Sequence, residues 1–473
     1  MPTAWVAAPA DAVVQRVAAA LDDPQTSGVV LVGADGVGKT LLAHAAAETF
    51  VAGKPSTVVR WVAGTAPGRT VPFGAFRGLL DITDVAETGR PADLLRAAHD
   101  SLTGDGGELL FVVDDAHHLD HLSATLLYQL ALSRLARLIV TVRADTELPD
   151  AVAALSADEL LALVEVEPLD KPATAAALES ALGVPLEDPI TDEVFRCSQG
   201  NPLYLRHLVQ GGELEKGPPL PALIDGYLAG LPTPVRTVLD YLAVAEPLRR
   251  ADLAALAGED AVDEAETAGA VASDDDAMVH AAHPLYTDRV RAALGADTAR
   301  GLRTSLVGQL TAGPSGRTGD RLRLAALAVD SDVPGAAADI VTAAQDALRL
   351  GEVELAEQLA RAALDRSGGL AARLALAYAL TWQGRGRDAG AVLEAVDPEQ
   401  LSQPELIEWA LPRAANQFWM LSEPERATAF LQTMRNRLSA PTALATLDAL
   451  AATFAMNAGT PLRALRIAGE VLA

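Results

Sequence analysis

The stretch "GVVLVGADGVGKT", residues 28–40, constrains the fold most, because a glycine-rich turn joins an apolar run to an Ala-rich helical segment. The turn matches G-x-x-x-x-G-K-[ST], a pattern that cradles phosphate groups between a β-strand and an α-helix. Glycines let backbone N–H groups approach a phosphate, and the helix N-terminus adds partial positive charge. The alternative is a glycine-rich turn without a ligand, which the complete pattern between strand and helix disfavours.

Two residues of this turn have specific expected roles. Lys39 would reach the β- and γ-phosphates of a nucleotide, and Thr40 would supply a hydroxyl to Mg²⁺. The expected nucleotide contacts come from the whole segment, which consists of Gly33, Ala34, Asp35, Gly36, Val37, Gly38, Lys39, Thr40 and Leu41. The sequence therefore predicts ATP or ADP with Mg²⁺ as cofactors.

Polar residues follow two further apolar runs. Asp114 and Asp115 end "LLFVVDD", and Arg143 ends "RLIVTVR". The carboxyl ends of parallel strands share one sheet edge, so we expect these residues beside the phosphate loop. Asp114 would hold Mg²⁺, Asp115 would polarise the attacking water, and Arg143 would read the γ-phosphate as a third catalytic group beside Lys39. The alternatives are acids that cap the next helix and an arginine on the surface.

The N-terminal part of the chain alternates β-branched runs with helical patterns, as expected of a parallel sheet covered on both faces. The predicted strands cover residues 28–33, 56–64, 109–115 and 137–143. From about 151 the pattern becomes helical, and a Pro-rich stretch at 216–224 marks a boundary. We therefore expect a P-loop NTPase domain over 1–150 and a helical lid domain over 151–217.

The rest of the chain is predicted to be mainly helical. Short helices and a turn between short apolar runs indicate a winged-helix-like domain over 218–300. Helices over 301–473 repeat with Ala at equivalent places, typical of tetratricopeptide-like repeats in an α-solenoid. These positions are Ala356, Ala389, Ala427 and Ala464. Because the last repeat ends without a polar capping helix, we expect the solenoid to be truncated.

Composition excludes several function classes. The net charge of −26 argues against nucleic acid or an anionic membrane as a ligand of this segment. No stretch is long and apolar enough to span a bilayer, and no secretory signal is evident, so a cytoplasmic location is expected. The single cysteine, Cys197, fits a reducing compartment. His117 and His121 stand four residues apart without a further ligand, so a metal site there is not expected.

The phosphate loop, the double-Asp strand, "VRAD" and "GNPLYL", followed by the predicted winged helix and repeats, occur together in one family. In this order they resemble the AAA+-related STAND signal-transduction ATPases. The resemblance is greatest to the large ATP-binding LuxR-type (LAL, MalT-like) transcriptional regulators, over roughly residues 5–473. It implies that Gly200 and Pro202 belong to a lid motif near the adenine. It also implies that His283 contacts the β-phosphate of ADP in a closed state.

Without the resemblance, "GNP" is a turn with Asn201 as a helix cap, and His283 is a core or capping residue. The sequence also departs from the family. "AAPAD" at 7–11 replaces a Gly-Arg signature near the adenine, and His118 replaces an aromatic residue. No C-terminal DNA-reading helix–turn–helix is present in the sequence.

These features predict a nucleotide-switched regulatory ATPase with slow hydrolysis, whose repeats sense a ligand or protein. ADP would favour a closed form, whereas ATP and a signal would favour an open, homo-oligomeric form. The alternative is a non-catalytic interaction scaffold with a structural nucleotide site. The lack of a guanine-reading N-K-x-D disfavours a GTPase. Residues 246–277 carry ten acids against Arg249 and Arg250, which disfavours DNA binding by this segment. The signal, the oligomeric state and the hydrolysis rate stay open.

Overall fold

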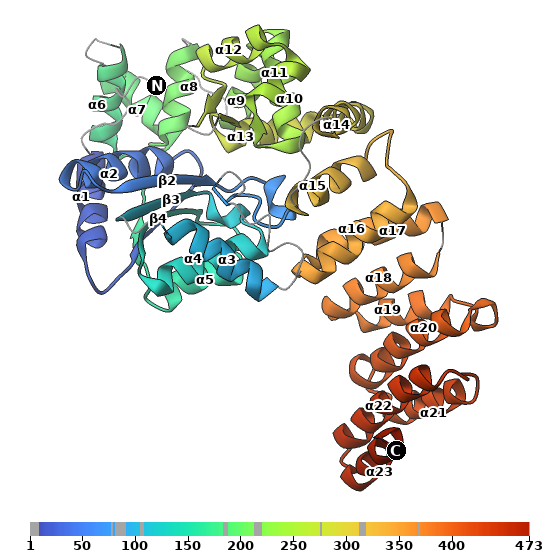
Figure 1. The fold of residues 1–473 in the computed structure, drawn as a ribbon. Helices are drawn as coiled ribbons and strands as arrows, with labels where there is room; N and C mark the ends of the chain where they lie inside the picture. The colour runs from blue at the N-terminus through green and yellow to red at the C-terminus, as the bar shows by residue number, and fades with distance from the viewer. Residues whose placement is uncertain are drawn as a thin grey trace. The chain divides into compact units, whose positions relative to one another are not determined.

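The computed structural model divides the chain into two units, Met1–Asp332 and Val333–Ala473 (Figure 1). The structure describes residues 9–76, 79–80, 91–104, 108–182, 188–211, 220–274, 277–311, 318–367 and 369–472. Each unit is treated separately below.

Unit 1 contains a five-stranded parallel sheet among its described residues, in the order β2-β3-β4-β1-β5. The strands are β1 (Gly28–Gly33), β2 (Val58–Ala63), β3 (Leu109–Asp114), β4 (Ala136–Arg143) and β5 (Ala162–Glu165). The four predicted strands therefore lie where the apolar runs indicated. In register, Gly33 pairs with Arg143 and Ala63 with Asp114, so the phosphate loop and both polar strand ends meet at one edge.

Helices cover both faces of this sheet, with α1 and α2 on one face and α3, α4 and α5 on the other (Figure 1). Their bounds are α1 (Pro9–Asp22), α2 (Lys39–Gly53), α3 (Pro91–Thr103), α4 (His121–Ser133) and α5 (Asp150–Ala157), with short 3₁₀ turns η2 (Gly68–Thr70) and η3 (Ala116–His118). The core between α2 and the sheet includes Leu42, Ala46, Leu31 and Leu110, all buried. A parallel sheet enclosed by helices fits a P-loop NTPase.

Strand β5 departs from the interpretation of 151–215 as wholly helical. It pairs with β1 at the edge of the sheet and has four residues. Val164 is buried, whereas Leu163 is 53% exposed. A run this short, with one large apolar residue facing outward, carries too little periodicity to be told from a helical pattern.

Helices α6 to α9 follow the sheet. They are α6 (Lys171–Leu182), α7 (Asp188–Ser198), α8 (Pro202–Gly211) and α9 (Leu220–Gly230), around a small core of Leu178, Val194, Tyr204, Leu205 and Leu208. Residues 216–219 of the predicted Pro-rich boundary lie outside the described residues.

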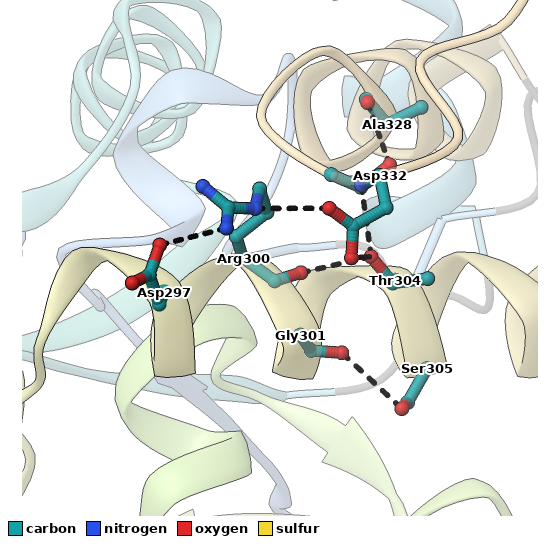
Figure 2. Close-up of polar contacts among 8 residues, drawn as sticks. Asp297, Arg300, Gly301, Thr304, Ser305, Ala328 and Asp332 are labelled. Carbon is teal, nitrogen blue, oxygen red and sulfur yellow. Dashed lines mark hydrogen bonds and ion pairs between the residues drawn. The ribbon is translucent and has the colours of Figure 1, made fainter.

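The last part of unit 1 combines helices with a small antiparallel sheet of order β6-β8-β7. Its elements are α10 (Thr233–Ala245), β6 (Leu248–Arg249), α11 (Arg250–Ala257), α12 (Glu259–Thr267), β7 (Val271–Ser273), β8 (Met278–Ala281), α13 (Pro284–Ala293), α14 (Ala296–Thr311) and α15 (Thr318–Val329). Figure 2 shows how the chain after α15 is held against α14. Arg300 Nε lies 2.9 Å from Asp332 Oδ1, and the Asp332 N–H donates to Thr304 Oγ1 over 2.9 Å.

Unit 2 is helical throughout its described residues, and successive helices pack against each other. Its helices are α16 (Ala337–Leu350), α17 (Val353–Ser367), α18 (Leu370–Trp382), α19 (Gly386–Glu394), η4 (Pro398–Gln400), α20 (Gln403–Ala415), the π-helical turn η5 (Asn416–Met420), α21 (Pro424–Arg435), α22 (Pro441–Asn457) and α23 (Pro461–Leu472). The four repeated alanines noted in the sequence, Ala356, Ala389, Ala427 and Ala464, are all buried. Small side chains there let neighbouring helices approach closely. Within the described ranges of the whole chain, no helix is long and apolar enough to cross a membrane.

Candidate nucleotide-binding site

The phosphate loop runs from the end of β1 to the start of α2. Gly36 and Gly38 have φ of 73° and 96°, which glycine adopts without a steric penalty. The Lys39 side chain folds back into the loop, where Nζ donates to the carbonyl oxygens of Gly33 (3.0 Å) and Ala34 (2.9 Å). Burial lowers the pKa of Lys39, and Asp115 and Asp35 oppose that shift. The loop thus holds a buried cation.

Asp114 accepts hydrogen bonds from two hydroxyl groups at the end of β3. Thr40 Oγ1 donates to Oδ2 over 2.8 Å, and Thr141 Oγ1 donates to Oδ1 over 2.6 Å. Thr40 and Asp114 therefore bring two oxygen atoms together from the phosphate loop and a strand end. Oxygen donors of this kind suit Mg²⁺, which is commonly held by one or two protein groups and by phosphate oxygens. The donor set fits the predicted metal site.

Asp115 has an unusual backbone and an unusual environment. Its φ of 49° is left-handed, and its N–H donates to Thr141 Oγ1 over 2.9 Å. Burial and the adjacent Asp114 raise the pKa of Asp115 to about 8, against the effect of Lys39. A carboxyl group with that pKa is mostly protonated at pH 7, and a cation bound nearby would lower the pKa.

Arg143 ends β4 next to the phosphate loop. Its Nε lies 2.6 Å from Asp35 Oδ1, so the guanidinium group pairs with a carboxylate of the loop itself. Burial raises the pKa of Asp35, whereas Arg143 and Lys39 lower it.

A cavity of about 690 Å³ opens beside the loop. This volume lies in the range of small-molecule and cofactor sites. Ten of the residues predicted from the sequence line it: Asp35, Gly36, Gly38, Lys39, Thr40, Leu41, Asp114, Asp115, Pro202 and His283. Of the other predicted residues, Gly33, Ala34, Val37 and Arg143 belong to the loop or the strand ends but not to the cavity wall, and Gly200 of the lid motif is not on the wall either.

The "GNP" turn contacts the phosphate loop directly. Asn201 Nδ2 donates to the Asp35 carbonyl oxygen over 2.7 Å, and the Leu203 N–H donates to the Gly36 carbonyl oxygen over 3.1 Å. Asn201 Oδ1 also accepts from the N–H groups of Leu203 and Tyr204, so the side chain caps α8. One asparagine thus starts the helix and ties it to the loop.

His283 both caps a helix and lines the cavity. Its Nδ1 accepts from the Leu285 N–H over 3.1 Å, which makes it the cap of α13. It lines the cavity with Pro202, which comes from α8. Burial lowers the pKa of His283 to about 3, and Lys39 and Arg143 add to the effect. The ring is therefore neutral at pH 7.

Sequence reasoning missed a buried carboxyl at the cavity wall. Glu246 is 7% exposed; its Oε1 accepts from the Ala281 N–H (2.7 Å) and its Oε2 from Thr287 Oγ1 (3.1 Å). The Glu246 carbonyl oxygen accepts from Thr65 Oγ1, just after β2, over 2.9 Å. No sequence motif marks Glu246 as a residue of the site. Other lining residues that the sequence did not single out include His44, Glu48, Arg206, Asp288 and Arg291.

His117 lies behind the site, with Nδ1 3.8 Å from Asp115 Oδ1. It is fully buried, neither ring nitrogen has a hydrogen-bond partner, and burial lowers its pKa to about 3. Within the part of the chain that the structure describes, no group of three or more His, Cys, Asp or Glu residues is arranged to hold a metal ion.

Comparison with known proteins agrees with this geometry. Residues 24–149 match the model of a family described as AAA domain. A search of curated proteins gave no match. Among solved structures, Cdc6p from Pyrobaculum aerophilum is 14% identical, with 60% of this chain and 92% of that chain covered and a TM-score of 0.30. Drosophila ORC bound to AT-rich DNA and Cdc6 is 11% identical, with the same coverage and a TM-score of 0.24. TM-scores this low do not establish a shared fold. The family match is confined to residues 24–149, where the phosphate loop and the enclosed parallel sheet fit a P-loop NTPase fold.

Proposed function

We propose that the chain is a regulatory ATPase that uses bound nucleotide as a switch. The observation that carries the proposal is the cavity wall. Segments around Lys39, Pro202 and His283 contribute to it, from the phosphate loop, α8 and the start of α13. A nucleotide bound there would contact all three segments at once, so gain or loss of the γ-phosphate would change how they are held together.

The proposed roles follow the chemistry of each residue. Lys39 and the loop N–H groups bind the β- and γ-phosphates, and Thr40 and Asp114 hold Mg²⁺. Asp115 orients the attacking water, and Arg143 reads the γ-phosphate. Pro202 packs near the adenine and His283 near the β-phosphate. ADP then favours a closed arrangement and ATP an open one.

The element order of residues 233–293 supports the finer assignment within unit 1. A helix, a short strand, two helices and a two-stranded hairpin follow one another, as expected of a winged helix. With a lid over 151–217, a winged-helix-like domain over 218–300 and tetratricopeptide-like repeats over 301–473, the chain would be a STAND ATPase of the LuxR-type regulators. The repeats would sense the signal, and any DNA-binding end would lie outside this sequence. A homo-oligomer is the proposed activated form.

The test is nucleotide content and binding. Purified protein should carry ADP or ATP, and Lys39→Ala should lose it, since a buried charge-assisted contact is removed. Lys54→Ala is the matched control, because Lys54 pairs with Asp22 and Glu108 at the surface. At ~100 times Kd, nucleotide should add roughly 2.7 kcal/mol to the unfolding free energy. Nucleotide-free protein that shows no thermal shift with ATP or ADP would refute the proposal.

A non-catalytic scaffold is the second candidate. The observation that favours it is that Lys39 and Thr40 already have hydrogen-bond partners within the protein. Hydrolysis by Asp115→Asn separates the two: a fall in a measurable wild-type ATPase rate supports the switch. A wild-type rate no higher than that of Asp115→Asn supports the scaffold.

A further inference from the structure

The phosphate loop contains a negatively charged side chain, the carboxylate of Asp35. Asp35 lines the cavity, and its carboxylate pairs with Arg143 at 2.6 Å. The two side chains are partly buried, at 29% and 23% exposure. Arg143 is also the residue at the end of β4 in register with Gly33, the first glycine of the loop. A loop suited to phosphate thus places a carboxylate on an arginine at its own sheet edge, just outside the cavity wall.

The backbone around Asp35 is fixed by the start of α8. Asn201 Nδ2 donates to its carbonyl oxygen, and the Leu203 N–H donates to that of Gly36. An added Cβ on Gly36 would lie 2.7 Å from Leu203 Cβ, so the loop packs closely on α8. Asp35 can therefore leave Arg143 by rotating its side chain, whereas a shift of its backbone would break the contacts with α8.

Carboxylate and phosphate oxygens compete for the same partner. A guanidinium group binds either anion through its N–H fork. The Asp35 carboxylate lies at Nε of Arg143, one side of that fork. Lys39 also attracts the carboxylate, and Asp288 on α13 repels it. A second anion would either displace Asp35 from Nε or bind the other guanidinium nitrogens beside its negative charge.

We propose that Asp35 is an internal substitute for the γ-phosphate: it holds Arg143 when the bound nucleotide is ADP and makes the site discriminate against ATP. The inference rests on the proposed function. ADP has no γ-phosphate and leaves the Asp35–Arg143 pair intact. ATP has to break the pair or place its γ-phosphate beside the Asp35 carboxylate, and part of its binding free energy is lost in doing so.

The experiment measures Kd for Mg-ADP and Mg-ATP by calorimetry on the full chain after nucleotide removal. Asp35→Asn keeps the size of the side chain and removes its charge. It should lower the Kd for ATP about two- to fivefold, as expected for loss of a partly exposed ion pair, and change the Kd for ADP less than about twofold. Asp35→Glu keeps the charge and should keep the discrimination. Asp145→Asn removes an equal charge from an exposed site outside the cavity wall, and should change neither value.

A double mutant tests the route through Arg143. Arg143→Gln should raise the Kd for ATP. In a protein that already carries Arg143→Gln, Asp35→Asn should no longer change the ratio of the Kd for ATP to the Kd for ADP. If Asp35→Asn left the ratio of the two Kd values unchanged, the inference would be overturned and the proposed function would still stand. Wild-type protein that binds neither nucleotide would overturn both.

Discussion

The cavity of unit 1 and the helices of unit 2 use charged side chains in opposite ways. Around the cavity, Lys39 and Glu246 are buried, at 7% exposure each. In unit 2, pairs such as Arg385–Asp388 and Arg426–Glu423 lie at the surface, at the N-terminal ends of α19 and α21. Exposed pairs of this kind contribute little to stability, whereas a buried charge costs free energy unless it is paired. These pairs of unit 2 thus stay solvated at little cost, whereas burial of Lys39 and Glu246 at the cavity carries a desolvation cost that their hydrogen bonds must offset.

The largest effect is expected at Gly200, in the turn before α8 next to the Asn201 that bonds the phosphate loop. Gly200 has φ of 72°, and an added Cβ would overlap the Leu169 carbonyl oxygen. Gly200→Ala should therefore lower the unfolding free energy of unit 1 by about 3 kcal/mol. Gly384→Ala in unit 2 is the control: φ is 77°, close to that of Gly200, but the space is open, so only about 1–2 kcal/mol of backbone strain is expected. Calorimetry of the full chain measures both, and equal losses would show that the Leu169 contact is unimportant.

Substitutions of Glu246 test whether the buried polar groups at the cavity satisfy each other's hydrogen bonds. Glu246→Ala leaves the Ala281 N–H without its acceptor and leaves the Thr287 hydroxyl with the Pro284 carbonyl oxygen alone, and should cost about 2 kcal/mol. Glu246→Gln retains an acceptor for Ala281 and a donor for Thr287, and should cost less than half as much. Hydrogen exchange over residues 278–288 reports the loss locally. Faster exchange in Glu246→Gln than in Glu246→Ala would contradict the assignment.

Asn201 tests a smaller contribution of the same kind. Asn201→Ala removes the cap of α8 and the bond to the Asp35 carbonyl oxygen, and should cost about 1–2 kcal/mol. Asn201→Asp keeps an oxygen for the cap but loses the donor to Asp35. Chemical denaturation should rank Asn201→Asp between wild type and Asn201→Ala in stability if both contacts contribute.

The sequence predicts the sheet edge better than it predicts the contacts across the cavity. The loop at 33–40 and the polar strand ends at Asp114 and Arg143 follow from periodicity, because strand ends in a parallel sheet share an edge. The pairing of Arg143 with Asp35 and the burial of Glu246 do not follow from any periodicity in the sequence. They depend on side chains that lie far apart in the chain and that no local pattern marks. Strand β5 was missed for the opposite reason: its pattern is local but too short.

The smallest effect is expected at the exposed pair that ends unit 1 (Figure 2). Arg300 pairs with Asp332 and Asp297, and the side chains of Arg300 and Asp332 are 48% and 58% exposed. Water already solvates both charges, so Arg300→Ala should change the unfolding free energy by less than about 0.5 kcal/mol. High salt should reduce that change further, because exposed charges are screened.

The backbone contact beside that pair provides the internal comparison. Thr304 Oγ1 accepts from the Asp332 N–H, and Thr304→Val removes this acceptor with little change in shape. Its effect should persist at high salt, because no charged group is removed from the contact. If Arg300→Ala instead cost as much as Asn201→Ala, exposure would not separate the two kinds of polar contact.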